Sequence, residues 1–370
     1  MELEVNKDPY MFLHVMPKEK FTYGFIEFTF ATFPEVDIKF VVYGDDDAQG
    51  YEPYDDFRVV SVPSAKAVFE DETSLTLLRD SDIVILNWVN MSMLPNMWHY
   101  LPKTHLLFWG GDYSPYVEAG WNGLSHCLKR KLLQVCIGRS RGIIALLPGD
   151  LRIIETISNP DSSRHVCELG YLASRYDADI CCTDKRAPFP VNILLGNSAT
   201  PTNRHKSALD ALSRFANEDI KIYAPLSYGD DAYRDEVIIY GRELFGDKFV
   251  PVTEFMERSE YISFLTKISI GVFNYDRQQG LGNIHLLMRM GAKVFLSQDS
   301  GMLSEHIDNG AAVECLEDVP KLTFDEFCAP LAAEAVARNN GLYSGESNFA
   351  RAKAHWGAFY GAEPIEGDFS

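Results

Sequence analysis

A loop with two glycines, an arginine and several amide side chains carries the strongest chemical signal in the chain. It runs from Phe273 to Asn283 and precedes an apolar segment predicted to form a helix. The first turn of a helix has free backbone N–H groups and the positive end of the helix dipole, so it binds anions. Gly280 and Gly282 permit close backbone approach, and Arg277 suits bidentate contact with phosphate. These residues predict a diphosphate site; a tight turn without a ligand is the alternative.

This loop is not the dinucleotide-binding fingerprint of nicotinamide enzymes. That fingerprint has three glycines and follows the first strand of its unit. Here His285 occupies the third glycine position, and the loop follows the fourth predicted strand of its half. The sequence therefore argues against a dehydrogenase, and no cofactor is expected.

A second polar loop leaves the first predicted strand of the same half at its carboxyl end. It runs from Leu195 to His205 and supplies amide, hydroxyl and imidazole groups. Because parallel strands present their carboxyl ends at one edge of a sheet, we expect these groups near the first loop. A capped surface turn uses the same residue types, so the residues alone leave both interpretations open.

A run of three aspartates, Asp45 to Asp47, contains the D-x-D pattern that holds Mg²⁺ or Mn²⁺ in GT-A transferases. We interpret the run as a solvated turn because glycines flank it. The nine histidines show no H-E-x-x-H or comparable spacing, and the seven cysteines show no paired C-x-x-C spacing. No metal, structural zinc or disulfide framework is therefore expected.

The segment from Leu128 to Arg141 has five cations and no anion in a chain whose net charge is −19. Lys129, Arg130 and Lys131 lie in a partly apolar stretch that we expect to be helical. Such a helix either lies on an anionic membrane surface or presents a solvated face, and the sequence leaves both interpretations open.

The composition is that of a folded globular protein. The 370 residues are 46% hydrophobic and 24% charged, which excludes disordered and fibrous classes. A charge of −19 argues against a general nucleic-acid-binding surface because phosphates would be repelled. The acidic start and the lack of a run of about 18 apolar residues predict a cytoplasmic chain, peripheral on the inner membrane at most.

Short β-branched runs alternate with helix-length amphipathic segments, which is typical of parallel sheets covered by helices. The predicted strands form two sets of six, one for each half of the chain. The first set is 10–16, 38–43, 58–62, 83–86, 105–109 and 142–147, and the second is 191–195, 220–225, 249–252, 269–274, 292–297 and 312–316.

A polar stretch with two prolines, from Cys181 to Pro190, predicts a linker between two domains. We expect a first domain at residues 1–187, a second at 188–345, and a C-terminal helix and tail at 346–370 that packs back on the first domain. Two Rossmann-like doubly wound α/β domains facing a cleft form the GT-B layout. Glycosyltransferases share this layout with nucleotide-sugar epimerases and some dehydrogenases, so function must come from particular loops.

Several short pieces of the chain resemble the TDP-N-acetylfucosamine:lipid II N-acetylfucosaminyltransferase family. The likeness extends over residues 191–300 and includes three short pieces upstream. The matching pieces are 193–198, 203–205, 224–228, 277–282, 109–112 and 148–151, together with 12–15. The resemblance implies an inverting, metal-independent transfer of 4-acetamido-4,6-dideoxygalactose to a polyprenyl-diphosphate-linked saccharide in enterobacterial common antigen assembly.

The resemblance also implies a role for each loop. Arg277, Gln278, Gln279 and the backbone amides from Gly280 to Asn283 would hold the donor diphosphate and stabilise the leaving group without a metal. Other residues match the donor side of the family: Gly196, Asn197, Ser198, Asn203, His205 and Tyr228.

An inverting transfer needs one general base on the acceptor hydroxyl. We expect it in the first domain, where Asp112 follows a strand ending at Trp109 and His14 closes the first strand; both match the family pattern. A turn-forming aspartate and a hydrogen-bonded core histidine are the structural alternatives. Glu118 and Asp150 are further candidates.

The residues and the resemblance together lead to three alternative hypotheses for the function. The first is a GT-B transferase that uses a nucleotide-diphosphate deoxyamino sugar, TDP-linked, and a lipid-linked saccharide acceptor. The second is the same fold acting on another nucleotide sugar or on a non-lipid acceptor. The third is a catalytically silent module that binds a nucleotide sugar.

Overall fold

The computed structural model describes residues 10–48, 50–116, 124–157, 165–168 and 190–361. The chain divides into two compact units, one made of Met1–Arg175 with Phe349–Ser370 and the other of Tyr176–Asn348. The predicted linker and the boundary at 187/188 lie outside the described residues, apart from Pro190. Within the described ranges, no helix has the length and apolar character needed to cross a membrane.

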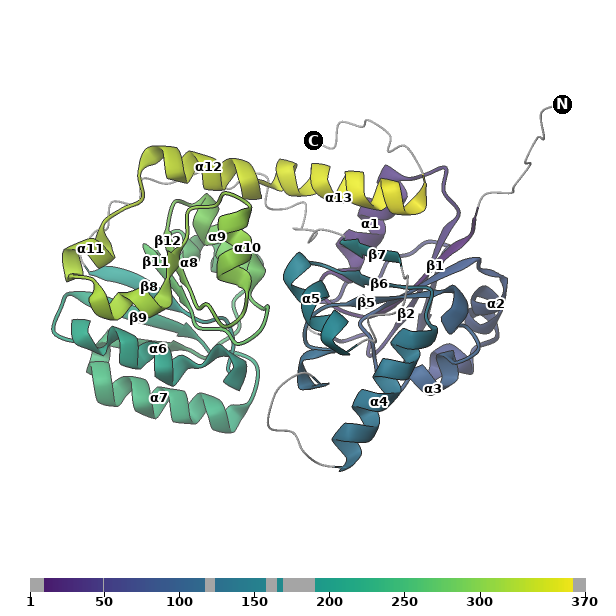
Figure 1. Cartoon of the computed structure of the whole chain (residues 1–370), viewed down its shortest axis with the longest axis horizontal. Helices are drawn as coiled ribbons and strands as arrows, with labels where there is room; N and C mark the ends of the chain where they lie inside the picture. Colours follow the sequence, from purple (N-terminus) through teal and green to yellow (C-terminus); the bar gives the residue numbers. More distant parts are fainter. Residues whose placement is uncertain (1–9, 49, 117–123, 158–164, 169–189, 362–370) are drawn as a thin grey trace. The chain divides into compact units, whose positions relative to one another are not determined.

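The first unit contains one parallel sheet of seven strands in the order β3-β2-β1-β4-β5-β6-β7. Parallel sheets need both faces covered, and helices lie over each face (Figure 1). The strands are β1 Phe12–Pro17, β2 Ile38–Tyr43, β3 Val59–Val62, β4 Ile83–Asn87, β5 Thr104–Phe108, β6 Gly142–Ala145 and β7 His165–Glu168. The helices are α1 Thr22–Thr32, α2 Glu72–Asp80, α3 Leu94–Met97, α4 Leu124–Arg139, α5 Pro148–Ile157 and α13 Gly345–Tyr360.

The second unit contains a parallel sheet of six strands in the order β10-β9-β8-β11-β12-β13. Its strands are β8 Val191–Leu195, β9 Ile220–Pro225, β10 Phe249–Val252, β11 Ile270–Phe273, β12 Lys293–Leu296 and β13 Glu314–Cys315. Its helices are α6 His205–Leu212, α7 Asp231–Phe245, α8 Arg258–Leu265, α9 Leu281–Arg289, α10 Met302–Asp308, α11 Phe324–Cys328 and α12 Ala333–Tyr343. The strand order reverses between β8 and β11, and ligands of doubly wound folds bind outside the strand ends at such a point.

The two sets of six predicted strands are present, and the prediction of two doubly wound α/β units is confirmed. The first sheet has one strand more than predicted, because β7 is a four-residue segment, His165–Glu168, with little apolar character. The neighbouring strand β6 pairs with β7 in the sheet, and this pairing stabilises a strand that its own sequence does not predict.

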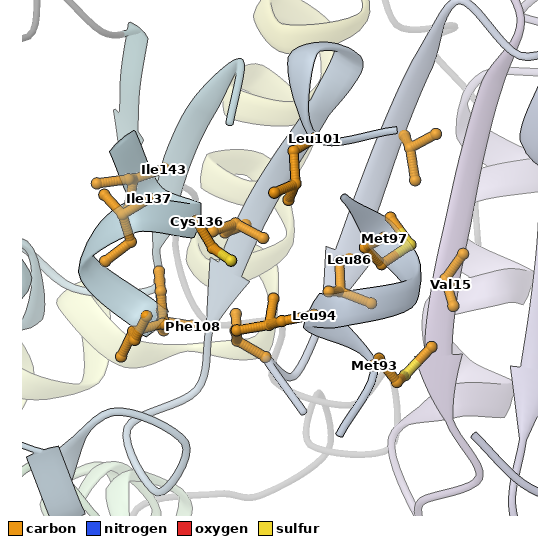
Figure 2. Packing of buried hydrophobic residues seen from close by; sticks show 14 of the residues in the cluster. Val15, Leu86, Met93, Leu94, Met97, Leu101, Phe108, Cys136, Ile137 and Ile143 are labelled. Atoms are coloured by element: carbon orange, nitrogen blue, oxygen red, sulfur yellow. The ribbon is translucent and has the colours of Figure 1, made fainter. Parts of the chain in front are cut away.

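One core of the first unit lies between the sheet and the helices α3 and α4. Buried side chains from strands and helices interdigitate there, as protein interiors require (Figure 2). The labelled members are Val15, Leu86, Met93, Leu94, Met97, Leu101, Phe108, Cys136, Ile137 and Ile143.

The opposite core of this unit is closed by α13, from the far end of the chain. Trp356 and Tyr360 of α13 are 2% and 6% exposed and pack with aromatic residues of β1 and α1. The ring of Tyr360 lies edge-on to Phe12, with 4.9 Å between centroids, and Trp356 lies 5.1 Å from Phe25. The prediction that the C-terminal helix packs back on the first domain is therefore confirmed.

Candidate functional site

Helix α9 of the second unit begins without a side-chain cap. Its N-cap residue is Gly280, which has left-handed backbone angles (φ 65°, ψ 16°) and no side chain to accept a hydrogen bond. The N–H groups of the first turn, from Leu281 to Asn283, therefore receive no capping hydrogen bond from an N-cap side chain. A Cβ atom at Gly280 would also overlap the Tyr275 hydroxyl, so both the backbone angle and the space require glycine.

The second polar loop is folded around Asn203, which is 1% exposed. Its Oδ1 accepts a hydrogen bond from the Asn197 N–H at 2.9 Å, and its Nδ2 donates to Thr200 Oγ1 at 2.7 Å. Gly196 has a φ of +68°, and a Cβ there would lie 2.6 Å from His205 Nε2. The loop is thus tightly packed, and Gly196 cannot be replaced without displacing its neighbours.

The structure brings the two predicted loops together. The Thr202 hydroxyl donates a hydrogen bond to Gln279 Oε1 at 2.7 Å, and the Asp276 N–H donates to the Thr202 carbonyl at 3.3 Å. The Asn274 side chain donates to the Arg204 carbonyl at 3.3 Å. Contacts between residues 70 or more positions apart therefore place the second loop beside the start of α9.

Four buried polar atoms of these loops have no hydrogen-bond partner in the described part of the chain. They are Asn197 Oδ1, His205 Nε2, the Tyr275 hydroxyl and Gln279 Nε2. Leaving one buried polar group unpaired costs about 1–3 kcal/mol, so native proteins pair such groups with protein, water or a ligand. The four atoms belong to two loops that meet at one uncapped helix start, and a polar ligand there would supply partners for them.

Burial shifts several ionisable groups beside α9 toward their neutral forms; it raises the pKa of Asp276, although the neighbouring Arg277 and Arg204 oppose that shift. Burial lowers the pKa of His205 to about 4, so its imidazole is uncharged near neutral pH. Burial raises the pKa of Tyr275 well above its usual value, and it raises that of Tyr261 as well, although a hydrogen bond with Asn283 opposes the shift at Tyr261. Both phenols therefore keep their protons and are hydrogen-bond donors.

The other predicted donor residues lie in the same unit. Tyr228 is 49% exposed, and its hydroxyl accepts a hydrogen bond from Asn197 Nδ2 at 3.1 Å. Ser198 is 3% exposed and lies 3.0 Å from the Thr200 hydroxyl. Gln278 is 7% exposed, and its carbonyl accepts a hydrogen bond from the half-buried Arg277 at 3.2 Å. Arg277 is thus held at the surface of the loop that precedes α9.

Three residues of this site were not predicted from the sequence: Thr202, Tyr261 and Tyr275. Tyr275 lies inside the predicted loop from Phe273 to Asn283, and its position just beyond the end of β11 is the signal that indicates it. Tyr261 is on α8 and meets α9 only in the folded unit, so its sequence position gives no such signal.

Asp112 lies in a turn of the first unit and is 6% exposed. Its carboxylate accepts hydrogen bonds from the backbone N–H groups of Val89 at 2.9 Å, Gly110 at 3.0 Å and Trp109 at 3.1 Å. Burial raises its pKa to about 6, and these N–H groups act in the opposite direction. Such a pKa suits a general base near neutral pH, while the three bonds also make Asp112 the residue that holds the turn.

His14 is 0% exposed and lies among aromatic rings of the first unit. Its Nε2 is 2.8 Å from the Tyr360 hydroxyl, and its Nδ1 is 3.3 Å from Asn87 Nδ2. Burial lowers its pKa to about 3. These contacts favour the core interpretation that the sequence left open. Of the further candidates, Asp150 accepts a hydrogen bond from Tyr113, and Glu118 lies outside the described residues.

The predicted membrane-contact residues Lys129, Arg130 and Lys131 are all exposed on α4. Leu128 and Val135 of the same helix are 63% and 40% exposed. The aspartates from Asp45 to Asp47 are exposed, and Asp46 pairs with Lys18 at 2.6 Å. Among the described residues, no group of three or more His, Cys, Asp or Glu side chains is placed to hold a metal ion.

A family model described as 4-alpha-L-fucosyltransferase, glycosyl transferase group 56, matches residues 104–318, which is more than half of the chain. The fold is also that of several solved structures. The N-terminal domain of Candida albicans trehalose-6-phosphate phosphatase is 11% identical, with a TM-score of 0.65, and the match covers 96% of this chain and 97% of that chain.

Two further structures show the same fold. The α,α-trehalose 6-phosphate synthase of Burkholderia multivorans is 10% identical, with a TM-score of 0.64 and coverage of 95% and 98%. The Escherichia coli trehalose-6-phosphate structure with bound UDP-2-fluoro glucose is 9% identical, with a TM-score of 0.62 and coverage of 96% and 100%. The predicted GT-B fold is therefore confirmed.

The first prediction concerns Gly280. Gly280→Ala should lower the free energy of unfolding by about 1–2 kcal/mol through its left-handed backbone and by about 1–3 kcal/mol more through overlap with Tyr275. Gly301→Ala is the matched control, because Gly301 is also a left-handed N-cap (φ 71°) but has no atom near its Cβ position. Urea denaturation measures both, and equal losses would contradict the argument for steric crowding.

The second prediction concerns pH. The raised pKa means that the native state holds the Asp112 proton more tightly than the unfolded state. Its contribution to stability is therefore present below a pH of about 4 and is lost as the pH rises through about 6. Asp112→Asn cannot titrate, so its unfolding free energy should vary less across this window. Urea denaturation at stepped pH measures the slope, with the exposed Asp45→Asn as control; a wild-type slope in Asp112→Asn would contradict the assignment.

Proposed function

The chain belongs to the 4-alpha-L-fucosyltransferase family, glycosyl transferase group 56, and from this premise we propose its donor and acceptor. It is a glycosyltransferase of GT-B fold. The proposed reaction moves a deoxyamino sugar of N-acetylfucosamine type from a TDP-sugar to a polyprenyl-diphosphate-linked saccharide, in bacterial surface-polysaccharide biosynthesis. The observation that carries the donor assignment is the uncapped start of α9 beside four buried, unpaired polar atoms.

We base the fit to a nucleotide diphosphate on the Arg277 guanidinium and several neutral donors, which outnumber the single acidic side chain of the loop, Asp276. In the proposed reaction, the bond between the anomeric carbon and the phosphate oxygen breaks, and its electron pair remains on the diphosphate. The first-turn N–H groups of α9 and the Arg277 guanidinium would stabilise that charge. The Tyr275 hydroxyl and Gln279 Nε2 would donate further hydrogen bonds, which removes the cost of leaving them unpaired.

The acceptor hydroxyl attacks the anomeric carbon on the opposite face in an inverting transfer and must lose its proton. We assign that proton to Asp112, because its pKa of about 6 allows it to accept a proton near neutral pH. The contacts of His14 favour a structural role over a part in this step, since both ring nitrogens face hydrogen-bonding groups in a fully buried position.

A second candidate is transfer from a different nucleotide sugar or to a non-lipid acceptor. The E. coli structure of the same fold holds a UDP-sugar. The residues at the start of α9 suit the diphosphate of a donor and do not distinguish its base or its sugar. A silent binding module is the remaining alternative, and turnover with a labelled donor separates it from the two enzymes.

The third prediction tests the donor site. Among TDP, UDP, GDP and CMP, TDP should raise the melting temperature most, because it is the nucleotide of the proposed donor. A ligand at about a hundredfold excess over Kd adds about 2.7 kcal/mol of stability. Tyr275→Phe should remove most of this shift while leaving the unliganded protein as stable as the wild type or more so, since a buried unpaired hydroxyl is lost.

Tyr43→Phe is the control, because it removes a buried phenolic hydroxyl from the first unit. A full TDP shift in Tyr275→Phe would contradict the diphosphate assignment. A larger shift with UDP than with TDP would replace the donor named here by the second candidate.

A lipid-linked acceptor requires the protein to reach a membrane surface. We propose that α4 does so, because Lys129, Arg130 and Lys131 are exposed beside the exposed apolar side chains of Leu128 and Val135. Cations attract anionic headgroups, and exposed apolar side chains enter the interface. The strongly negative charge of the rest of the chain limits this attraction to a local surface.

The fourth prediction tests this surface. The wild type should float with vesicles of phosphatidylglycerol and phosphatidylethanolamine at low salt, and Lys129/Lys131→Glu should not, because the attraction becomes repulsion. Lys66/Lys321→Glu makes the same change in net charge at exposed cations elsewhere and should still float. Equal flotation of both variants, or none in the wild type, would leave α4 as a solvated helix.

A further inference from the structure

Trp88 has a backbone conformation that a tryptophan rarely adopts. It directly follows β4, and its φ is +59°. Among the described residues, Arg204 is the other non-glycine residue with a positive φ. A Cβ atom disfavours this region, and a bulky side chain there is a genuine outlier. Such strain persists where the surrounding structure imposes it, and it clusters at ligand sites.

The strained backbone directs the Trp88 indole against a second tryptophan. Trp109 follows the neighbouring strand β5, and the two rings lie edge to face with 5.9 Å between centroids and 75° between planes. A Cβ at Gly111 would lie 2.9 Å from the Trp88 indole, so a residue with a side chain at this position would displace the ring. Phe21, 40% exposed, extends the aromatic surface, with 6.4 Å between its centroid and that of Trp109.

Asp112 holds both tryptophan-bearing turns in place. One of its carboxylate oxygens accepts the N–H of Val89, the residue after Trp88, and the other accepts the N–H of Gly110, the residue after Trp109. The N–H of Trp109 itself also donates to this carboxylate at 3.1 Å. The arrangement of the two rings is therefore built by buried, charge-assisted hydrogen bonds and is not a chance surface contact.

The position of the pair in the fold is where α/β proteins bind ligands. The strand order of the first sheet reverses between β1 and β4, and Trp88 and Trp109 follow the carboxyl ends of β4 and β5. Both indoles are half-buried, and the polar Asn90 lies close to Trp88, with its N–H donating to the Trp88 carbonyl at 2.8 Å. Half-exposed aromatic rings among polar groups suit a ligand with both an apolar face and hydroxyls.

We propose that Trp88 and Trp109 form a stacking platform for one pyranose ring of the acceptor saccharide. The axial C–H groups of a pyranose make an apolar face that packs on an indole, and its equatorial hydroxyls remain available to polar neighbours. A polyprenyl chain would instead need a continuous apolar surface, which the adjacent Asn90 and glycine backbone interrupt. The proposal rests on the proposed function for the identity of the ligand as an acceptor.

The test measures saccharide binding in the absence of donor and turnover. The probes are methyl β-galactopyranoside and methyl N-acetyl-β-glucosaminide, observed by saturation-transfer NMR. At least one probe should bind saturably, with the strongest transfer to the ring protons of its apolar face. Trp88→Leu/Trp109→Leu should weaken binding about tenfold or more, whereas Trp88→Phe/Trp109→Phe should retain most of it because the π faces remain.

Trp98→Leu is the matched control, because Trp98 is a 38% exposed tryptophan of the same unit. Trp88→Gly gives a second variant, since glycine adopts a φ of +59° without strain and should melt at a higher temperature than Trp88→Leu. If folded Trp88→Gly and the double leucine variant bind as the wild type does, or if neither probe binds the wild type, the platform is overturned. Loss of the TDP shift would instead count against the donor site alone.

Discussion

The start of α9 depends on a steric constraint at Gly280. A residue with a side chain would need a left-handed backbone and would overlap the Tyr275 hydroxyl, so this helix cannot have the Ser, Thr, Asp or Asn cap that helices usually have. The first-turn N–H groups therefore receive no hydrogen bond from an N-cap side chain. The second loop is then fixed against this start through Thr202 and Gln279.

Strands and their order along the chain could be predicted because their apolar runs are local signals. The match fails at β7, whose four residues gain their strand conformation from pairing with β6. Helix α6 begins at His205 and not at the preceding polar residues, because Asn203 uses its side chain to close the loop before the helix. Local sequence patterns therefore predict which strands and helices form. The predicted boundaries are less accurate where tertiary hydrogen bonds compete with the local pattern.

The candidate site was predictable only in part, for the same reason. Gly280, Arg277 and Gln279 lie in one segment, so a single loop revealed them. Tyr261 and Thr202 meet this segment only through folding, and no spacing in the sequence indicates it. His14 and Asp112 show a further limit, because burial decides how a titratable side chain behaves: it lowers the pKa of His14 and raises that of Asp112.

The helix α13 has a consequence for how the protein is made. Its residues from Phe349 onward complete the aromatic core of β1 and α1, yet they leave the ribosome after every strand of the second sheet. During vectorial synthesis, the second unit has all of its strands while the first still exposes the apolar surface that Trp356 and Tyr360 cover. The N-terminal part of the chain therefore finishes folding last, and its nascent form is the one that needs protection from aggregation.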